Sequence, residues 1–184
     1  MSFIPLRQHL RTQRQSLSAS DVASTSLKIT DLCCQLAEFQ IAQHIAFYVA
    51  NENEIDTRYL FEKTIALGKT TYFPVLNENH LDFVKTDYHT TFVKNKFDIL
   101  EPSSGEKIDP NTLDIVFVPV VGFNELCHRI GRGKGYYDQT LAHINRPAFI
   151  GLAYAFQKTE LPEREPWDIA MDFVVTEEKI YSHV

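Results

Sequence analysis

The feature that most constrains the fold is an alternation of strand-like and helix-like segments between residues 45 and 75. A short β-rich apolar run at 45–49 is followed by a polar stretch at 51–57. Apolar residues then recur at helical spacing as far as Gly68, and a second β-rich run occupies 70–75. This order is typical of a βαβ unit, in which the two strands are parallel and the connection is right-handed. The segment therefore predicts an α/β fold.

A further strand is predicted at 113–119, where the sequence Leu-Asp-Ile-Val-Phe-Val-Pro is nearly all apolar. Such a run is typical of a strand that is buried on both faces. It leads into a glycine cluster at 131–135 and then into a helix expected at 136–143. Further strands are expected at 147–152 and 173–176, weak strands at 81–84 and 91–93, and a loop at 101–105.

The N-terminal segment predicts two helices. Residues 5–40 contain no glycine, and their apolar residues recur at helical spacing. The helices should separate near 18–20, where either Ser18 or Ser20 can cap the second helix, with Asp21 near its positive end. The first helix carries a basic face, which consists of Arg7, Arg11 and Arg14.

Length and composition are those of one globular domain. The chain has 184 residues, of which 44% are hydrophobic, so a sizeable core can form. Its formal net charge of −6 argues against nonspecific attraction to nucleic acid or to an anionic membrane. Any anionic ligand should therefore be held by a local basic cluster.

Cysteine usage and hydropathy predict a cytoplasmic protein. The three cysteines are an odd number, and their spacing fits neither a disulfide framework nor a zinc site. The N-terminus lacks the apolar core of a signal peptide, and no apolar run approaches the ~20 residues of a membrane span. A reducing compartment fits these features best.

The segment that carries chemistry is 129–138, with the sequence Arg-Ile-Gly-Arg-Gly-Lys-Gly-Tyr-Tyr-Asp. Alternating glycines allow several backbone N–H groups to turn towards one point, and three cations add donors for phosphate oxygens. Asp138 closes the segment, where a carboxylate can hold Mg²⁺ against phosphates. The segment matches neither a Walker A loop nor a dinucleotide fingerprint, and a simple glycine turn with solvated cations is the alternative.

The sequence from 118 to 138 resembles the signature of the 5-formyltetrahydrofolate cyclo-ligase family. Three other segments agree with that family in order and spacing: the basic helix that begins at Leu6-Arg7, the stretch 48–57, and the stretch 161–177. The resemblance covers nearly the whole chain. It implies a single Rossmann-like, three-layer α/β domain over 1–184, with a mostly parallel central sheet and helices on both faces.

The resemblance also implies an activity, which is the ATP- and Mg²⁺-dependent conversion of 5-formyltetrahydrofolate to 5,10-methenyltetrahydrofolate, with release of ADP and phosphate. The residues implied to contact ATP are Arg7, Arg129, Ile130, Gly131, Arg132, Gly133, Lys134, Gly135, Tyr136 and Tyr137. Those implied to contact the folate are Val49, Glu54, Arg132, Gly133, Lys134, Gly135 and Tyr136. Arg132 and Lys134 are the expected catalytic residues, Asp138 and Asp172 the expected Mg²⁺ ligands, and a monomer is expected.

Three positions depart from the family pattern, namely Phe3, Asn124 and Cys127. Phe3 stands where a basic residue is common, and Asn124 and Cys127 replace the usual Asp and Gly. Cys127 adopts a positive φ less readily than Gly, which bears on the turn before the loop. Two alternatives to a cyclo-ligase remain: a non-catalytic nucleotide- or folate-binding protein, and, by fold analogy alone, a sugar-phosphate isomerase or CoA-transferase-like enzyme.

Overall fold

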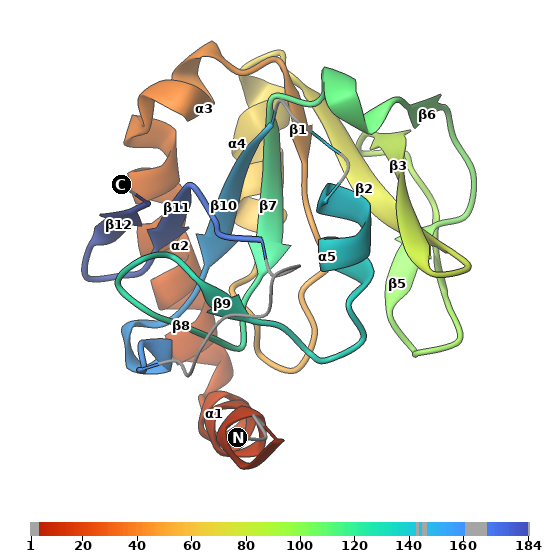
Figure 1. Ribbon diagram of the computed structural model, residues 1–184. Coiled ribbons are helices and arrows are strands. Elements are labelled where there is room, and N and C mark those ends of the chain that lie inside the picture. The colour runs from red at the N-terminus through yellow and green to blue at the C-terminus, as the bar shows by residue number, and fades with distance from the viewer. Residues whose placement is uncertain (1–3, 143, 145–146, 161–168, 184) are drawn as a thin grey trace.

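A computed structural model describes residues 4–142, 144, 147–160 and 169–183, and within these residues one mixed sheet organises the molecule (Figure 1). Its eight strands are, from one edge to the other, β12 (Ile180–Ser182), β11 (Phe173–Val175), β10 (Ala148–Leu152), β7 (Ile115–Pro119), β1 (His44–Ala46), β2 (Thr70–Asn77), β3 (His80–Thr86) and β6 (Lys107–Ile108). The mostly parallel α/β sheet expected from the sequence is confirmed.

The order of the parallel strands reverses once, between β1 and β7. All neighbouring pairs from β11 to β2 are parallel, whereas β12, β3 and β6 pair antiparallel at the two edges. Numbered along the chain, the five parallel strands lie in the spatial order 2-1-3-4-5. In a sheet of this order, the loops that leave the two strands beside the reversal diverge and open a crevice at the carboxyl edge.

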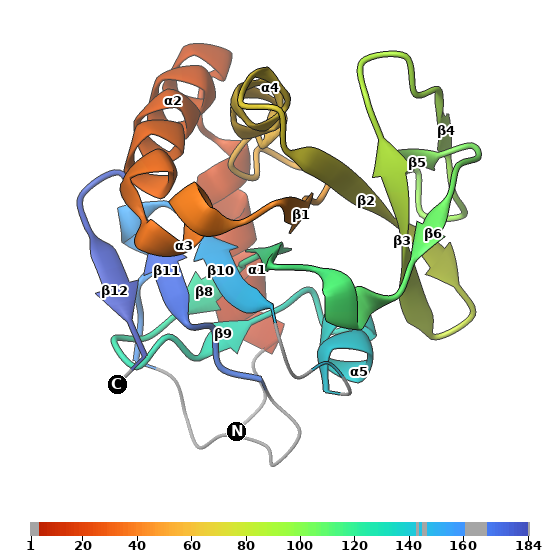
Figure 2. The ribbon, with the colours of Figure 1, turned by 90° about the horizontal axis from the view of Figure 1, so that it is seen from above.

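Helices cover both faces of the sheet (Figure 2). One face carries α2 (Ala19–Gln35), α3 (Ala37–Ile41) and α4 (Arg58–Ala66), and the other carries α5 (Tyr136–Leu141). Figure 1 shows α1 (Ile4–Gln15) beyond the ends to which β7 and β10 point. The first helix thus lies at the carboxyl edge of the sheet.

The remaining elements are short. Two hairpins pair β4 (Phe92–Lys94) with β5 (Leu100–Pro102), and β8 (Gly122–Phe123) with β9 (Arg129–Ile130). Two 3₁₀ turns are η1 (Pro110–Thr112) and η2 (Ala155–Gln157). No helix among the described residues is both long and apolar enough to cross a membrane.

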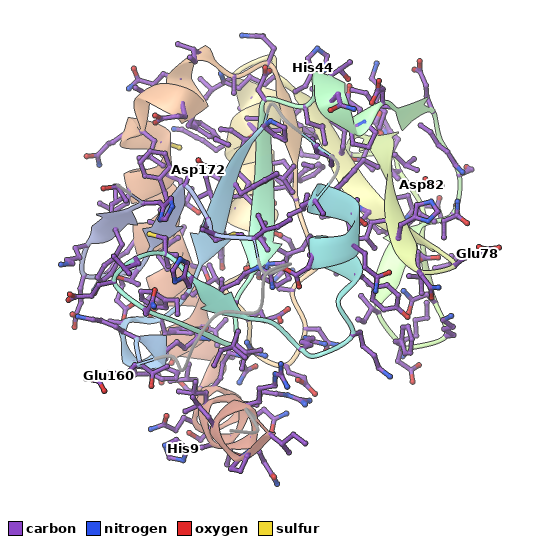
Figure 3. All side chains as sticks on the ribbon, in the orientation of Figure 1. His9, His44, Glu78, Asp82, Glu160 and Asp172 are labelled. Carbon is purple, nitrogen blue, oxygen red and sulfur yellow. The ribbon has the colours of Figure 1, made fainter. Side chains whose placement is uncertain are left out.

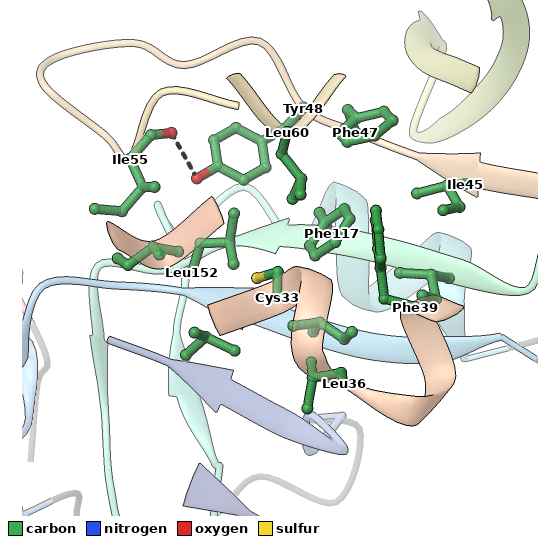
Figure 4. Packing of buried hydrophobic residues seen from close by; sticks show 14 of the residues in the cluster. Cys33, Leu36, Phe39, Ile45, Phe47, Tyr48, Ile55, Leu60, Phe117 and Leu152 are labelled. Carbon is green, nitrogen blue, oxygen red and sulfur yellow. Dashed lines mark hydrogen bonds between the residues drawn. The ribbon is translucent and has the colours of Figure 1, made fainter. Parts of the chain in front are cut away.

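The larger core cluster lies between the sheet and the layer formed by α2, α3 and α4 (Figure 4). Phe47 and Phe117 stack with ring centroids 5.4 Å apart, and both are fully buried. Cys33 of α2 and Leu60 of α4 pack against the same cluster. Aromatic rings bury a large apolar area, so this cluster fixes β1 and β7 next to each other.

The N-terminal segment is helical as predicted, with the first break at 16–18, but it forms three helices and not two, because the chain breaks again at Leu36 between α2 and α3. Of the two candidate caps, Ser18 is the N-cap of α2. Its hydroxyl accepts from the Asp21 N–H, and the Asp21 carboxylate accepts from the Ser18 N–H. This reciprocal capping box satisfies two N–H groups that an uncapped helix would leave unpaired.

The prediction of a loop at 101–105 is wrong in part, because Glu101 and Pro102 belong to β5. The helix expected at 136–143 ends at Leu141, and position 143 lies outside the described residues. The elements that the sequence did not indicate, such as β6, β8, β9 and β12, are two or three residues long. Segments this short show no periodicity, and their pairing partners decide their conformation.

Candidate active site

A cavity of about 990 Å³ opens at the carboxyl edge of the sheet, at the reversal between β1 and β7. The loop after β1 contributes Tyr48 to Glu54 on one side, and the segment from His128 to Asp138, downstream of β7, contributes the other side. A third wall comes from Pro74, Leu76 and Leu81 of the β2–β3 pair and from the β4–β5 hairpin. The cavity therefore lies where a ligand site is expected in a sheet of this order.

The glycine-rich segment forms the loop that leads into α5. Gly133 and Gly135 adopt positive φ values of 92° and 73°, and Gly135 is the N-cap of α5. These are conformations that residues with a Cβ adopt only at a cost, so glycine is needed there. Arg7 of α1 donates from Nε to the Gly131 carbonyl over 2.9 Å, which attaches the loop to the first helix.

Arg129 and Asp138 form an ion pair at the base of this loop. The Nη2 atom of Arg129 lies 2.6 Å from Oδ1 of Asp138, and the Arg129 side chain is buried. Among the described residues, the buried Nε atom of Arg129 has no hydrogen-bond partner. The pair holds the Asp138 carboxylate at the cavity wall, and Asp138 keeps a second carboxylate oxygen beyond the one that Arg129 contacts.

Three arginines and two glutamates form a charged cluster beside the cavity. Glu54 Oε1 accepts from Nε of Arg132 over 3.1 Å, and Nη2 of Arg14 lies 3.6 Å from the same oxygen. Glu52 receives two hydrogen bonds from Nη2 of Arg11, the shorter being 2.6 Å. The cluster joins α1, the loop after β1 and the glycine-rich loop, which are far apart in the sequence.

The two glutamates of this cluster differ in their acid strength. Glu54 is only 5% exposed, and burial raises its pKa above the usual value, although Arg132 and Arg14 oppose that effect. Burial also tends to raise the pKa of Glu52, but the hydrogen bond from Arg11 and the charges of Arg132 and Arg11 outweigh it and hold the pKa low. Glu54 is thus the carboxylate that depends most on its cationic neighbours.

The wall formed by the β4–β5 hairpin is largely apolar, although Asn95 and Glu101 also line it. Phe97 lies at the hairpin turn, with its ring centroid 6.0 Å from that of Tyr136 and 5.8 Å from Nζ of Lys134. Ile99 and Leu100 continue this wall. A planar heterocycle with polar edges can therefore lie between an aromatic wall and the charged cluster.

All the residues predicted for the site line this cavity, with the exception of Asp172. Asp172 precedes β11, and its carboxylate accepts from the Phe149 N–H over 2.7 Å. Figure 3 shows Asp172 away from the edge of the sheet where α1 lies. The structure thus does not bring Asp172 to the cavity that Asp138 lines, because β11 begins at the other end of the sheet.

Two of the three positions that depart from the family pattern, Asn124 and Cys127, still form a turn. Cys127 adopts a φ of 58°, the left-handed conformation that glycine takes more readily. The Asn124 side-chain oxygen accepts from the N–H groups of Leu126 and His128, as an aspartate would. Phe3 lies outside the described residues.

Sequence reasoning missed part of the cavity. Arg11 and Arg14 were visible as a basic helical face, but nothing in the sequence indicated that they reach Glu52 and Glu54. Phe97 lies in a polar, turn-rich segment without periodicity, so no local pattern marked it. These contacts depend on tertiary structure.

Comparisons with known proteins identify the family of this chain. The model of the 5-formyltetrahydrofolate cyclo-ligase family matches residues 4–177. A 5-formyltetrahydrofolate cyclo-ligase from Haemophilus influenzae is 34% identical over 176 residues, which cover 90% of this chain and 94% of the relative. The corresponding protein of Escherichia coli K12 is 31% identical over 148 residues, covering 77% of this chain and 81% of the relative.

Solved structures show the same fold. The chain superposes on 5,10-methenyltetrahydrofolate synthetase from Aquifex aeolicus with a TM-score of 0.89 at 30% identity, covering 100% of this chain and 93% of that one. The synthetase from Mycoplasma pneumoniae gives a TM-score of 0.79 at 26% identity, covering 96% and 99%.

The left-handed glycine at the start of α5 generates a prediction with a matched control. Gly135→Ala and Gly68→Ala both place a Cβ at a φ near 75°, and each should lower the free energy of unfolding by about 1–2 kcal/mol. Gly135→Ala alone should also weaken ATP binding, because Gly68 lies outside the cavity. Chemical denaturation and calorimetric titration with ATP measure the two effects. Equal ATP affinity in both variants would show that the loop conformation does not matter for binding.

Proposed function

The chain belongs to the 5-formyltetrahydrofolate cyclo-ligase family, and from that premise we propose that it cyclises 5-formyltetrahydrofolate to 5,10-methenyltetrahydrofolate with cleavage of ATP to ADP and phosphate. The observation that carries this proposal is the cavity at the β1–β7 reversal, which has a cationic glycine-rich loop on one side and Glu54 on the other. It combines a wall suited to phosphates with a wall suited to a polar heterocycle.

The chemistry explains why a phosphate-binding loop is needed. An amide oxygen is a poor leaving group, so the formyl oxygen attacks the γ-phosphorus of ATP and ADP departs. The neighbouring bridge nitrogen then bonds to the formyl carbon and loses its proton, while the oxygen leaves as inorganic phosphate. Phosphoryl transfer requires positioning and charge neutralisation, which the donors of Arg132 and Lys134 supply without any covalent enzyme intermediate.

The ATP contacts are assigned to the loop and to Arg7. Arg7 already holds the Gly131 carbonyl, so the first helix and the loop form one unit around the phosphates. The backbone N–H groups freed by the positive φ of Gly133 and Gly135 add to the cationic side chains. Arg129 is buried beneath them and orients Asp138.

A Mg²⁺ ion fits Asp138 but does not require a second protein carboxylate. Mg²⁺ takes most of its ligands from water and phosphate oxygens, and the described residues contain no group of three or more His, Cys, Asp or Glu suited to a metal. Asp138 would hold the ion through the oxygen that Arg129 does not contact. When bound, Mg²⁺ supplies neutralisation of the phosphate charge.

The folate is assigned to the other end of the cavity. Glu54 accepts hydrogen bonds from the pterin N–H groups, and Val49 and the ring of Tyr136 line the same space. Arg132 lies between the two ligands, since it contacts Glu54 and belongs to the phosphate-binding loop.

We also propose that the chain works as a single-domain monomer in the cytoplasm, in keeping with its three free cysteines.

Absorbance of the methenyl product tests the proposal. Mixing the protein with 5-formyltetrahydrofolate, ATP and Mg²⁺ should produce the methenyl chromophore, and omitting ATP or adding a chelator should prevent it. Binding of both ligands without product would identify a non-catalytic folate- or nucleotide-binding protein instead.

Lys134→Ala should reduce kcat on the order of 10²-fold or more, because its charge acts mainly on the transferred phosphoryl group. Lys28→Ala, on an exposed part of α2, is the matched control and should leave kcat unchanged. Steady-state rates at saturating ATP and folate measure the effect. A wild-type kcat in Lys134→Ala would remove this lysine from the catalytic step.

Glu54→Gln should raise the KM for the folate much more than the KM for ATP. The amide keeps the size of the side chain but accepts weaker hydrogen bonds from the pterin, and it does not touch the phosphates. Separate titrations of each substrate measure the two constants. An equal rise in both would place Glu54 outside the folate site.

A further inference from the structure

The most deeply buried charge beside the cavity belongs to a residue that the reaction described above does not use. Arg14 lies in the last turn of α1, its side chain is 1% exposed, and it is not among the residues that line the cavity. Burying a guanidinium is costly unless opposite charges and hydrogen-bond acceptors surround it. The groups around Arg14 must therefore offset the cost of burying its charge.

Two of the donors of Arg14 bind backbone carbonyls. Its Nε atom donates to the Glu52 carbonyl over 2.9 Å, and Nη1 donates to the Val120 carbonyl over 3.3 Å. Glu52 belongs to the loop after β1, and Val120 directly follows β7. Arg14 thus joins the two chain segments that leave the sheet on either side of the strand reversal.

The contact between α1 and the loop after β1 is reciprocal. The side-chain amide of Asn53 donates to the carbonyls of Arg14, Gln15 and Leu17, at the end of α1. Glu52 and Asn53 both adopt positive φ values, 52° and 57°, which are uncommon for residues other than glycine. The loop that carries Glu54 is therefore held in a strained conformation by Arg14 and Asn53.

The remaining donor of Arg14 faces the two carboxylates. Nη2 lies 3.6 Å from Glu54 Oε1 and 3.8 Å from Glu52 Oε2, and it has no hydrogen-bond partner among the described residues. It acts on Glu54 as a buried charge at short range, where screening by water is weak.

Arg132 alone cannot serve as the lasting counter-ion of Glu54. It is about one quarter exposed, it lines the cavity, and it is expected to contact ATP as well as the folate. If its guanidinium turned to the phosphates, Glu54 would lose the only cation that is hydrogen-bonded to it in the described structure. Arg14 stays in place because its other donors are bound to backbone carbonyls.

We propose that Arg14 is a positioning residue for Glu54: its buried guanidinium holds the loop after β1 in place and supplies the permanent positive charge that lets Glu54 present a carboxylate to the folate. This inference rests on the proposed function, because it assigns the folate contact to Glu54. It adds a residue that touches neither substrate.

The groups that face Glu54 agree with this role. Arg14 approaches from α1 and Arg132 from the glycine-rich loop, and Glu52 adds a negative charge from the same loop as Glu54. Three tyrosines also face it, and burial raises the pKa of each above its usual value, so they stay neutral: Tyr48, Tyr137 and Tyr154. The balance between burial and the two arginines therefore sets the charge of Glu54.

A pair of Arg14 variants separates charge from hydrogen bonding. Arg14→Gln keeps hydrogen-bond donors but removes the charge, and Arg14→Lys keeps the charge with fewer donors. A carboxyl group without its counter-ion is protonated at higher pH. The acid limb of folate binding, which is the pH range in which binding is lost as the pH falls, should therefore shift upward by roughly one pH unit or more in Arg14→Gln. In Arg14→Lys the limb should stay near that of the wild type.

The folate KM of Arg14→Gln should rise at least about tenfold at neutral pH, whereas the affinity for ATP should change little, since Arg7 and the glycine-rich loop are untouched. In the background Glu54→Gln, the further change Arg14→Gln should have a much smaller effect on the folate KM, because the charge that it served is gone. Steady-state rates at varied folate give the KM values, and equilibrium titrations with the folate across pH, and with ATP at one pH, give the pH dependence of folate binding and the ATP affinity.

Equal shifts of the acid limb in Arg14→Gln and Arg14→Lys, or no shift in either, would overturn the proposal. If Arg14→Gln does not fold, the thermal stability of the double variant Arg14→Gln, Glu54→Gln tests the proposal. The double variant should recover thermal stability, because it no longer buries an unpaired carboxylate. Failure to recover would also overturn the proposal. Turnover of the wild-type protein is measured separately, so a failure of the proposed function can be distinguished from a failure of this inference.

Discussion

The parallel pairing of β1 with β7 is the constraint on which the rest of the structure depends. The two strands pair through Ile45 with Ile115 and Ala46 with Val116, and all four side chains are fully buried. Because the strand order reverses here, the loops after β1 and after β7 leave the same edge in different directions. The cavity, the charged cluster and the glycine-rich loop all lie in the space that this reversal creates.

The first helix turns this crevice into a site. It lies outside the sheet, and its basic face reaches three different partners: the Gly131 carbonyl, the Glu52 carboxylate and the backbone of the loop after β1. A helix attached by so many polar contacts couples the glycine-rich loop to the loop after β1. Arg7, Arg11 and Arg14 are successive members of one helical face, but each contacts a different part of the site.

The charges in the cavity are divided between two chain segments. Cations predominate in the glycine-rich loop, which the proposed function assigns to phosphates, whereas carboxylates predominate in the loop after β1. Arg132 belongs to the first group but contacts the second. In the proposed function this single side chain would be shared by the two ligands, since each would compete for its donors.

Local patterns in the sequence determined the βαβ unit, the buried strand at 113–119, the N-terminal helices and the chemistry of residues 129–138, because periodicity, glycine spacing and caps act over a few residues. Only the tertiary structure decided that Arg14 lies beside Glu54, that Phe97 faces Tyr136, and that Asp172 contacts the backbone of Phe149 away from the cavity. Those contacts join residues 23 to 40 positions apart, and the packing of helices, hairpins and strands against one another determines which distant residues meet.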